Sequence, residues 1–264
     1  AGYGNRLFVD NINLNGTVAA PLPEASFTAS TTTLCSGNAV TFTNTSTNGT
    51  SYSWTFAGGT PATSTATNPI VTYATPGTYN VTLTATNAGG SNASNQTGYI
   101  TVNAIPAAPA ITAGGATTFC QGGSVTLTSS AGSATTWSNS ASGSSVTVNA
   151  SGNYTATTTV ASCTSSASNT ITVTMNPNPS VSFSGVPMLC VNDGPFTLTQ
   201  GSPAGGTYSG TGVTGNQFNP ATVGVSSTPV TYNYTNGNGC SGSAQTTVVV
   251  DGCASISENE LDFI

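Results

Sequence analysis

Residues 79–86 read Tyr-Asn-Val-Thr-Leu-Thr-Ala-Thr, with an apolar residue at every second position and mostly Thr between them. This period of two is typical of a β-strand with one buried and one exposed face, and the β-branched Thr suits the exposed face of a pleated sheet. The same alternation returns at residues 40–46 (VTFTNTS), 124–130 (SVTLTSS), 169–175 (NTITVTM) and 246–250 (TTVVV). Short strands between Gly, Pro and Asn turns predict an all-β sandwich fold, and they argue against disorder despite the polar composition.

Proline-rich stretches divide the chain at residues 20–23, 105–109 (IPAAP) and 176–179 (NPNP). The segments between them each have about the length of one small sandwich domain, and proline makes such joints semi-rigid. We therefore expect three tandem immunoglobulin-like β-sandwiches in an elongated rod. They are the first segment (residues 21–104), the second (105–176) and the third (177–251). Residues 1–20 are expected to be the final strand and linker of a preceding domain, and residues 252–264 a linker to a following one.

Charge is almost absent from the body of the chain. Charged residues make up 3% of the sequence, and between residues 25 and 250 Asp193 is the only one. With Arg6 as the single basic residue, the chain cannot neutralise nucleic-acid phosphates or an anionic membrane surface. No apolar stretch is long enough to span a bilayer. The sequence predicts no nucleic-acid partner and no membrane insertion.

The groups that carry catalysis are missing. There is no His and no Lys, so the common general bases and the Schiff-base nucleophile are absent. Glu258, Glu260 and Asp262 cluster in a tail that reads as a solvated linker. We expect no catalytic residue, no cofactor and no enzyme activity. The one metal hypothesis is calcium held by oxygens of Asp10, Asn11 and Asn13, a strand end being the alternative reading.

Six cysteines with no CxxC and no His favour disulfides over a zinc site, and therefore an oxidising compartment. Cys120 precedes one strand of the second segment and Cys163 follows another, and Cys190 and Cys240 hold the same places in the third. These positions predict the bonds Cys120–Cys163 and Cys190–Cys240, each either between two facing sheets or at the rim of the sandwich. Cys35 and Cys253 are left over. They are expected either as separate thiols or as a head-to-tail intermolecular link, Cys35 of one chain to Cys253 of the next.

The aromatic residues divide by their place in the strand pattern. Trp54 and Trp137 lie where a sandwich packs its core Trp, which we favour over a sugar platform. The candidates for a tyrosine corner are Tyr79, Tyr154 and Tyr234. The candidates for stacking on a glycan are Tyr52, Tyr73, Tyr208 and Tyr232.

The first segment resembles the PKD domain, an immunoglobulin-like fold. The resemblance rests on residues 54–61 (WTFAGGTP), on the pattern from Tyr73 to Leu83 (YxxPGTYxVxL), and on residues 86–90 (TNAGG). It implies a β-sandwich over about 80 residues. The acidic residue usual in the loop after the Trp strand is missing, so the resemblance implies no calcium there.

The rest of the chain is similar to other parts of bacterial surface proteins. Residues 189–213 (LCVNDGPFTLTQGSPAGGTYSGTGV) look like their immunoglobulin-like repeats, residues 1–14 like the last strand of a jelly-roll domain, and residues 248–264 like the junction before the sorting domain of type IX secretion cargo. The resemblance implies export across the outer membrane and display at the cell surface.

Together these features predict a non-catalytic extracellular module that forms a stalk or fibre at a bacterial surface. The alternative is a glycan- or protein-binding accessory region of a longer secreted enzyme such as a metalloprotease. Edge strands without charge favour association. The expected partners are copies of the chain itself or other surface proteins, or else polysaccharide.

Overall fold

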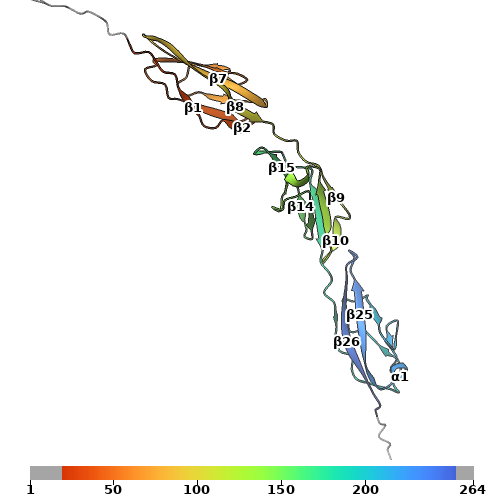
Figure 1. Ribbon diagram of the computed structural model, residues 1–264. Coiled ribbons are helices and arrows are strands. Elements are labelled where there is room, and N and C mark those ends of the chain that lie inside the picture. Colours follow the sequence, from red (N-terminus) through yellow and green to blue (C-terminus); the bar gives the residue numbers. More distant parts are fainter. Residues whose placement is uncertain (1–19, 254–264) are drawn as a thin grey trace, which may run out of the picture. The chain divides into compact units, whose positions relative to one another are not determined.

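The structure, a computed structural model, describes residues 20–253 (Figure 1). Among these residues nearly every element is a β-strand, which confirms the all-β prediction. The exceptions are a 3-10 turn, Gly132–Ala134, and a four-residue helix, α1 (Pro220–Val223). Asn219 caps α1 by accepting a hydrogen bond from the Ala221 N–H (3.1 Å). None of the described helices has the length and apolarity that crossing a membrane requires.

The first segment is a sandwich of two sheets. One sheet has the strand order β1-β3-β6 and the other β2-β8-β7-β4-β5. The alternation at residues 79–86 lies in β7, where Val81, Leu83 and Ala85 are fully buried. The strands are β1 (Phe27–Ala29), β2 (Thr33–Cys35), β3 (Ala39–Asn44), β4 (Ser51–Phe56), β5 (Thr63–Ser64), β6 (Ile70–Thr72), β7 (Gly77–Asn87) and β8 (Gly90–Asn103).

The second segment repeats the pattern with shorter strands. Its sheets include the orders β13-β11-β9 and β10-β17-β14. The strands are β9 (Ile111–Ala113), β10 (Thr118–Cys120), β11 (Val125–Ser129), β12 (Thr135–Trp137), β13 (Ser145–Val148), β14 (Gly152–Tyr154), β15 (Ala156–Val160), β16 (Cys163–Thr164) and β17 (Ile171–Asn176).

The third segment is built on a long hairpin, β25 (Ser226–Thr235) and β26 (Ser241–Asp251), which Figure 1 shows side by side. The hairpin belongs to the sheet β19-β26-β25-β22. The shorter strands are β18 (Ser182–Phe183), β19 (Leu189–Cys190), β20 (Phe196–Thr197), β21 (Gly201–Ser202), β22 (Thr207–Ser209), β23 (Val213–Thr214) and β24 (Gln217–Phe218).

Each segment has its own hydrophobic core, and the predicted tryptophans lie in two of them. Trp54 is fully buried, stacks on Phe56, and donates from Nε1 to the Ala66 carbonyl (2.9 Å). Trp137 is equally buried, and its Nε1 donates to the Gly143 carbonyl (3.0 Å). Both core predictions are confirmed. The third core has no Trp and is packed around Phe218 and Tyr232 instead.

Two of the three predicted tyrosine corners are present. The hydroxyl of Tyr79 donates to the carbonyl of Thr75 (2.8 Å), and that of Tyr154 donates to the carbonyl of Ala150 (3.1 Å). A hydroxyl bonded to the backbone a few residues upstream is the defining contact of this motif. Tyr234 packs half-buried against the third core instead.

The chain packs as two compact units. One comprises residues 20–108 and Thr157–Ala167, and the other Pro109–Ala156 and 168–253. The hairpin β15–β16 therefore packs with the first sandwich, although its sequence belongs to the second segment. The predicted boundaries of the three segments and their rod-like arrangement stay predictions.

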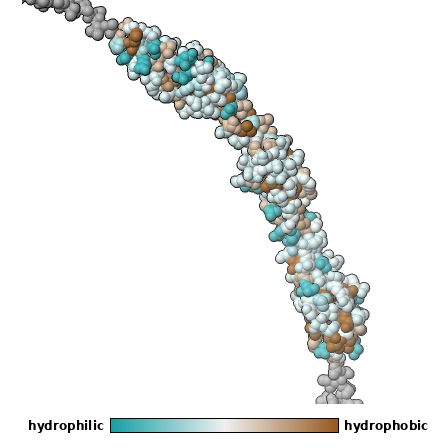
Figure 2. All heavy atoms as spheres, in the orientation of Figure 1, coloured by the Kyte–Doolittle hydropathy of each residue, from teal (hydrophilic) through white to brown (hydrophobic). Residues whose placement is uncertain are grey.

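The described surface is polar but almost uncharged. Figure 2 shows mostly pale spheres, with teal and brown residues scattered among them. Thr, Ser and Gly at the outward positions of the strands account for this intermediate hydropathy. The most exposed large apolar residues are Leu22, Ile70, Met188 and Val225, each more than 60% exposed.

Candidate functional site

The feature that recurs in all three segments is a short strand that ends in a cysteine. β2, β10 and β19 each pair in parallel with the last strand of their own segment, β8, β17 and β26. A parallel pair places the ends of both strands at the same edge of the sheet. The first cysteine of each segment therefore lies where the chain leaves that segment. The register pairs are Cys35 with Asn103, Cys120 with Asn176, and Cys190 with Asp251.

The backbone around these three cysteines is the same. The residue after each cysteine donates its N–H to the carbonyl at the end of the last strand, in the pairs Ser36 to Asn103 (2.9 Å), Gln121 to Asn176 (2.8 Å) and Val191 to Asp251 (2.9 Å). A turn follows at once, because the carbonyl of each cysteine accepts from the N–H three residues later. Gly37 and Gly122 adopt φ of +87° and +93° in the first two turns, a conformation that favours glycine.

The disulfides differ from the predicted ones. The bonds are Cys35–Cys163, Cys120–Cys240 and Cys190–Cys253, with Cα–Cα distances of 5.6, 5.4 and 5.4 Å. The predicted bonds Cys120–Cys163 and Cys190–Cys240 are wrong. The cysteines of residues 20–253 include no free thiol, so both predictions for Cys35 and Cys253, separate thiols and an intermolecular link, are wrong as well.

Strand direction explains the error. Cys120 lies beside Asn176 at the end of β17, whereas Cys163 precedes the start of that strand at Ile171. A strand of this length spans about 20 Å, and a disulfide needs Cα atoms within about 7 Å.

In the third segment the separation is greater. Cys190 lies beside Asp251 at the end of β26, and Cys240 directly precedes its first residue, Ser241. The strand between them spans about 36 Å. Each predicted pair would thus have joined opposite ends of one sandwich.

Cys163 reaches Cys35 from the tight turn of the hairpin β15–β16. Ala161 and Ser162, the two turn residues, have φ of +48° and +64°. Positive φ at both central residues is the signature of the type I′ turn that suits two-residue hairpins. The side-chain amide of Asn103 donates to the Ala161 carbonyl (3.2 Å), and the Cys35 sulfur lies 3.7 Å from the Ser162 carbonyl oxygen. The turn is thus held by both partners of the β2–β8 pair.

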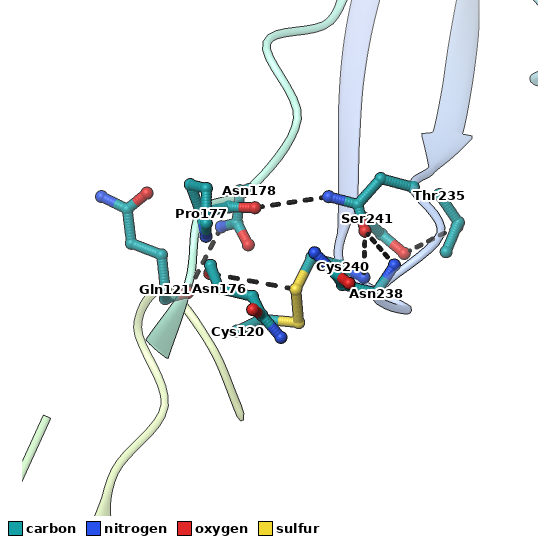
Figure 3. The surroundings of a disulfide bond; sticks show 10 residues. Cys120, Gln121, Asn176, Pro177, Asn178, Thr235, Asn238, Cys240 and Ser241 are labelled. Atoms are coloured by element: carbon teal, nitrogen blue, oxygen red, sulfur yellow. Dashed lines mark hydrogen bonds between the residues drawn. A yellow bond between two sulfur atoms is a disulfide. The ribbon is translucent and has the colours of Figure 1, made fainter. Parts of the chain in front are cut away.

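The second bond has an equivalent setting, drawn in Figure 3. Cys240 is fully buried, and its sulfur lies 3.9 Å from the Asn176 carbonyl oxygen. Asn236, at the start of the β25–β26 turn, accepts from the Cys240 N–H (3.0 Å) and donates to the Pro177 carbonyl (3.4 Å). The turn of the hairpin β25–β26 is thus attached to the end of the parallel pair β10–β17, as the turn of β15–β16 is to the end of β2–β8.

The third bond differs because its second cysteine lies on no hairpin. Cys253 follows the end of β26 by two residues and is half-buried. The Asp193 carboxylate accepts the Cys190 N–H at 2.7 Å, so the one charge of the chain's body caps this strand end.

The four tyrosines predicted to stack on a glycan have mixed outcomes. Tyr73 and Tyr232 are buried within their cores, so the prediction is wrong for both. Burial, together with Tyr79, raises the pKa of Tyr73 to about 12. Tyr52 and Tyr208 are half-buried against their cores, with their hydroxyls bonded to the backbone at Gly49 and Gly201. For these two the prediction remains untested.

Within residues 20–253 no three His, Cys, Asp or Glu side chains gather in a way that could hold a metal ion. The calcium hypothesis at Asp10, Asn11 and Asn13 concerns residues outside the described range and stays a prediction. The feature that the three segments share is therefore the cysteine at the end of a short strand that pairs in parallel with the segment's last strand.

The chain is similar in structure to several solved proteins. One is the crystal structure of murine CEACAM1b (18% identity, TM-score 0.32, 58% of this chain and all of that one). Another is described as a Ca²⁺-stabilized adhesin that helps an Antarctic bacterium bind ice (14%, 0.37, 88% and 75%), and a third is an I-band fragment of titin (12%, 0.31, 87% and 98%). None of these likenesses bears on function, and no curated protein matches the sequence. A family model does match in sequence: residues 19–102 match the PKD domain, as the first segment's motifs predicted.

Proposed function

We propose that the chain is a non-catalytic structural spacer that works outside a bacterial cell and holds whatever it joins at a distance. The observation that supports this most is the recurrence of one local design: in every segment a short strand that ends in a cysteine pairs in parallel with the last strand, and a disulfide leaves from the end of that pair. A repeated connection with a single geometry fits a mechanical role better than recognition, which needs one distinctive surface.

The disulfides suit a chain that bears tension. A pull that enters through β2 passes from Cys35 to Cys163 across the disulfide, so a covalent bond carries it rather than the hydrogen bonds of the β2–β8 pair. The disulfides add support for an extracellular setting, because such bonds persist in oxidising compartments.

Display at the surface through type IX secretion is part of the proposal. It is supported by the similarity of residues 248–264 to the junction before a sorting domain. The expected partners are other surface proteins or further copies of the chain, which meet surfaces with almost no charge repulsion.

Exchange of the module tests the proposal in cells. In the native protein, residues 20–253 are replaced by unrelated β-sandwich domains of similar total length, and separately deleted. A spacer predicts that deletion impairs surface presentation of the flanking parts and that the unrelated domains restore it. Failure of the unrelated domains to restore function would show that this chain makes a specific contact.

The alternative, an accessory region that binds a polysaccharide or protein, has one observation in its favour. A hollow of about 300 Å³ in the third segment is lined by Tyr208, Asn216 and Thr199 among others. Binding of the purified chain to an array of bacterial and host glycans, lost in Tyr208→Ala, would favour this function. No binding to the array would favour the spacer.

A further inference from the structure

The disulfides of the chain interlock. Along the sequence the cysteines occur at 35, 120, 163, 190, 240 and 253. The loop closed by Cys35–Cys163 overlaps the loop closed by Cys120–Cys240, because Cys120 lies before Cys163. The loop of Cys120–Cys240 likewise overlaps the loop of Cys190–Cys253, because Cys190 lies before Cys240. Each loop therefore overlaps the next one along the sequence. The predicted pairs within single segments would have given two separate loops.

Overlap has a direct topological consequence. Every peptide bond between Cys35 and Cys253 is bypassed by at least one disulfide, and those between Cys120 and Cys163 or between Cys190 and Cys240 by two. A single break of the backbone anywhere in this range leaves the two parts covalently joined.

The bypassed range includes the two proline-rich joints. Residues 105–109 form no strand, and Ile105 is 49% exposed. Residues 177–179 at the second joint also lack regular structure. Exposed backbone without pairing partners is where proteases cut folded proteins. Cys35–Cys163 spans the first joint, and Cys120–Cys240 spans the second.

The bonds also shorten the covalent route through the molecule. From residue 20 the shortest route runs to Cys35, crosses to Cys163, follows the chain to Cys190 and crosses to Cys253. This route contains about 42 residues instead of about 233, so at about 3.5 Å per residue the fully unfolded chain extends to about 150 Å rather than about 800 Å.

We propose that the three disulfides form one continuous covalent strap, which keeps the two parts of the chain joined after a single backbone cut between Cys35 and Cys253 and limits its extension under tension to about a fifth of that of the reduced chain. The strap gives the proposed spacer a property that spacing alone does not require: tolerance of proteases and of load. The topology itself does not depend on the spacer role.

A cut at a chosen place tests the strap in the purified full chain. The recognition sequence of a specific protease is inserted between Ala107 and Ala108, both exposed in the first joint. After cleavage, the strap predicts one covalent species on a non-reducing gel and two fragments after reduction. Mass spectrometry of the unreduced species should give the mass of the uncut chain plus one water. Two fragments without reduction would overturn the proposal.

Two controls make the result specific. The same site between Pro21 and Leu22 lies outside every disulfide loop, so cleavage there must release a fragment without reduction. In the variant Cys35→Ser with Cys163→Ser, cleavage between Ala107 and Ala108 must separate the fragments, because neither remaining bond spans that joint. Mass spectrometry of cross-linked peptides from the unmutated chain provides a check that needs no refolded variant: peptides joining Cys35 to Cys163 are expected, and peptides joining Cys120 to Cys163 would refute the strap.

Force spectroscopy measures the second property. Pulled through its ends, the oxidised chain should lengthen to no more than about 150 Å between residues 20 and 253, and the reduced chain to about 800 Å. Equal extensions would overturn the strap. Because both tests use the purified chain, their failure leaves the spacer role standing, and failure of the module exchange in cells leaves the strap standing.

Discussion

The first two segments and the third build the same strand end but complete it differently. In the first two, the cysteine at the end of β2 or β10 bonds to a hairpin turn, through Cys163 or Cys240, and that second cysteine is fully buried. In the third, Cys190 bonds to Cys253, which lies just beyond the end of the same segment's last strand and is half-buried.

The outward-facing residues at the parallel strand pairs also separate the third segment from the first two: they are threonines in the first two and apolar in the third. Thr33 pairs with Thr101 in the first segment and Thr118 with Thr174 in the second. The corresponding positions in the third are Met188 and Val249, which are 63% and 42% exposed. The cysteine-ended strand therefore has two uses. In the first two segments its disulfide attaches a hairpin turn from elsewhere in the sequence, and in the third it joins the strand to the end of the same segment.

The largest expected difference is in stability. Replacing both cysteines of a bond by Ser avoids a free thiol and releases its loop. For loops of 120 and 63 residues, the chain-entropy relation gives a loss of about 4 to 5 kcal/mol for either bond, slightly larger for Cys120–Cys240 than for Cys190–Cys253. Calorimetry of the two double variants beside the parent checks this. A larger loss for the Cys190–Cys253 pair would contradict the distinction between long-range and local closure.

The order of reduction should follow accessibility. Thiol–disulfide exchange requires a thiolate to reach one of the two sulfurs. The third bond presents two half-exposed cysteines, whereas each of the other two presents only one, Cys35 or Cys120, because its partner is buried. Under limiting reductant we expect Cys190–Cys253 to open first, at a rate several-fold above the other two. Alkylation at timed intervals followed by peptide mass spectrometry measures the order, and simultaneous opening of all three would remove this contrast.

The local sequence pattern was enough to predict the strands and their buried faces, but it did not predict which cysteines bond to each other. Alternation at Val81, Leu83 and Ala85 depends on neighbours two residues away, so it predicts which side chains are buried. The partner of Cys120 depends instead on whether the strand that carries it runs parallel or antiparallel to β17, which is a long-range property. The prediction placed Cys120 just before the strand at residues 124–129, on the sheet facing Cys163, whereas Cys120 ends a separate strand that is the parallel partner of the segment's last strand.

A sequence signal for the correct reading did exist. Each first cysteine is followed by a turn, as Cys-Ser-Gly-Asn at 35–38 and Cys-Gln-Gly-Gly at 120–123, and a chain that turns straight after the cysteine has ended its strand there. Asn103 and Asn176 close the last strands just before the joints. The buried tyrosines were beyond reach, because Tyr73 and Tyr52 occupy similar strand-like contexts yet differ in burial.

The turn after each cysteine gives a smaller contrast between the segments. Gly37→Ala and Gly122→Ala place a side chain at positive φ, which costs about 1 kcal/mol each. Gly194→Ala, in the third segment, is the matched control, since that glycine has no positive φ and nothing lies within 4 Å of an added Cβ. Thermal unfolding of the three variants should show a loss for the first two and none for the third. An equal loss at Gly194 would mean that the losses at Gly37 and Gly122 do not come from their positive φ.

The smallest expected effects concern two tyrosines of the first segment whose rings stack on each other. Tyr79 donates its hydroxyl to the Thr75 carbonyl, whereas the buried hydroxyl of Tyr73 has no hydrogen-bond partner among residues 20–253. Tyr79→Phe removes a hydrogen bond and should cost about 1 kcal/mol. Tyr73→Phe removes a polar group that was buried without compensation, so stability should be unchanged or rise by up to about 1 kcal/mol. Urea unfolding followed by tryptophan fluorescence, to which Trp54 of the first segment contributes, measures both. A loss at Tyr73 as large as that at Tyr79 would indicate that a bound water satisfies the Tyr73 hydroxyl, which would make that hydroxyl part of the core's hydrogen bonding rather than a cost to it.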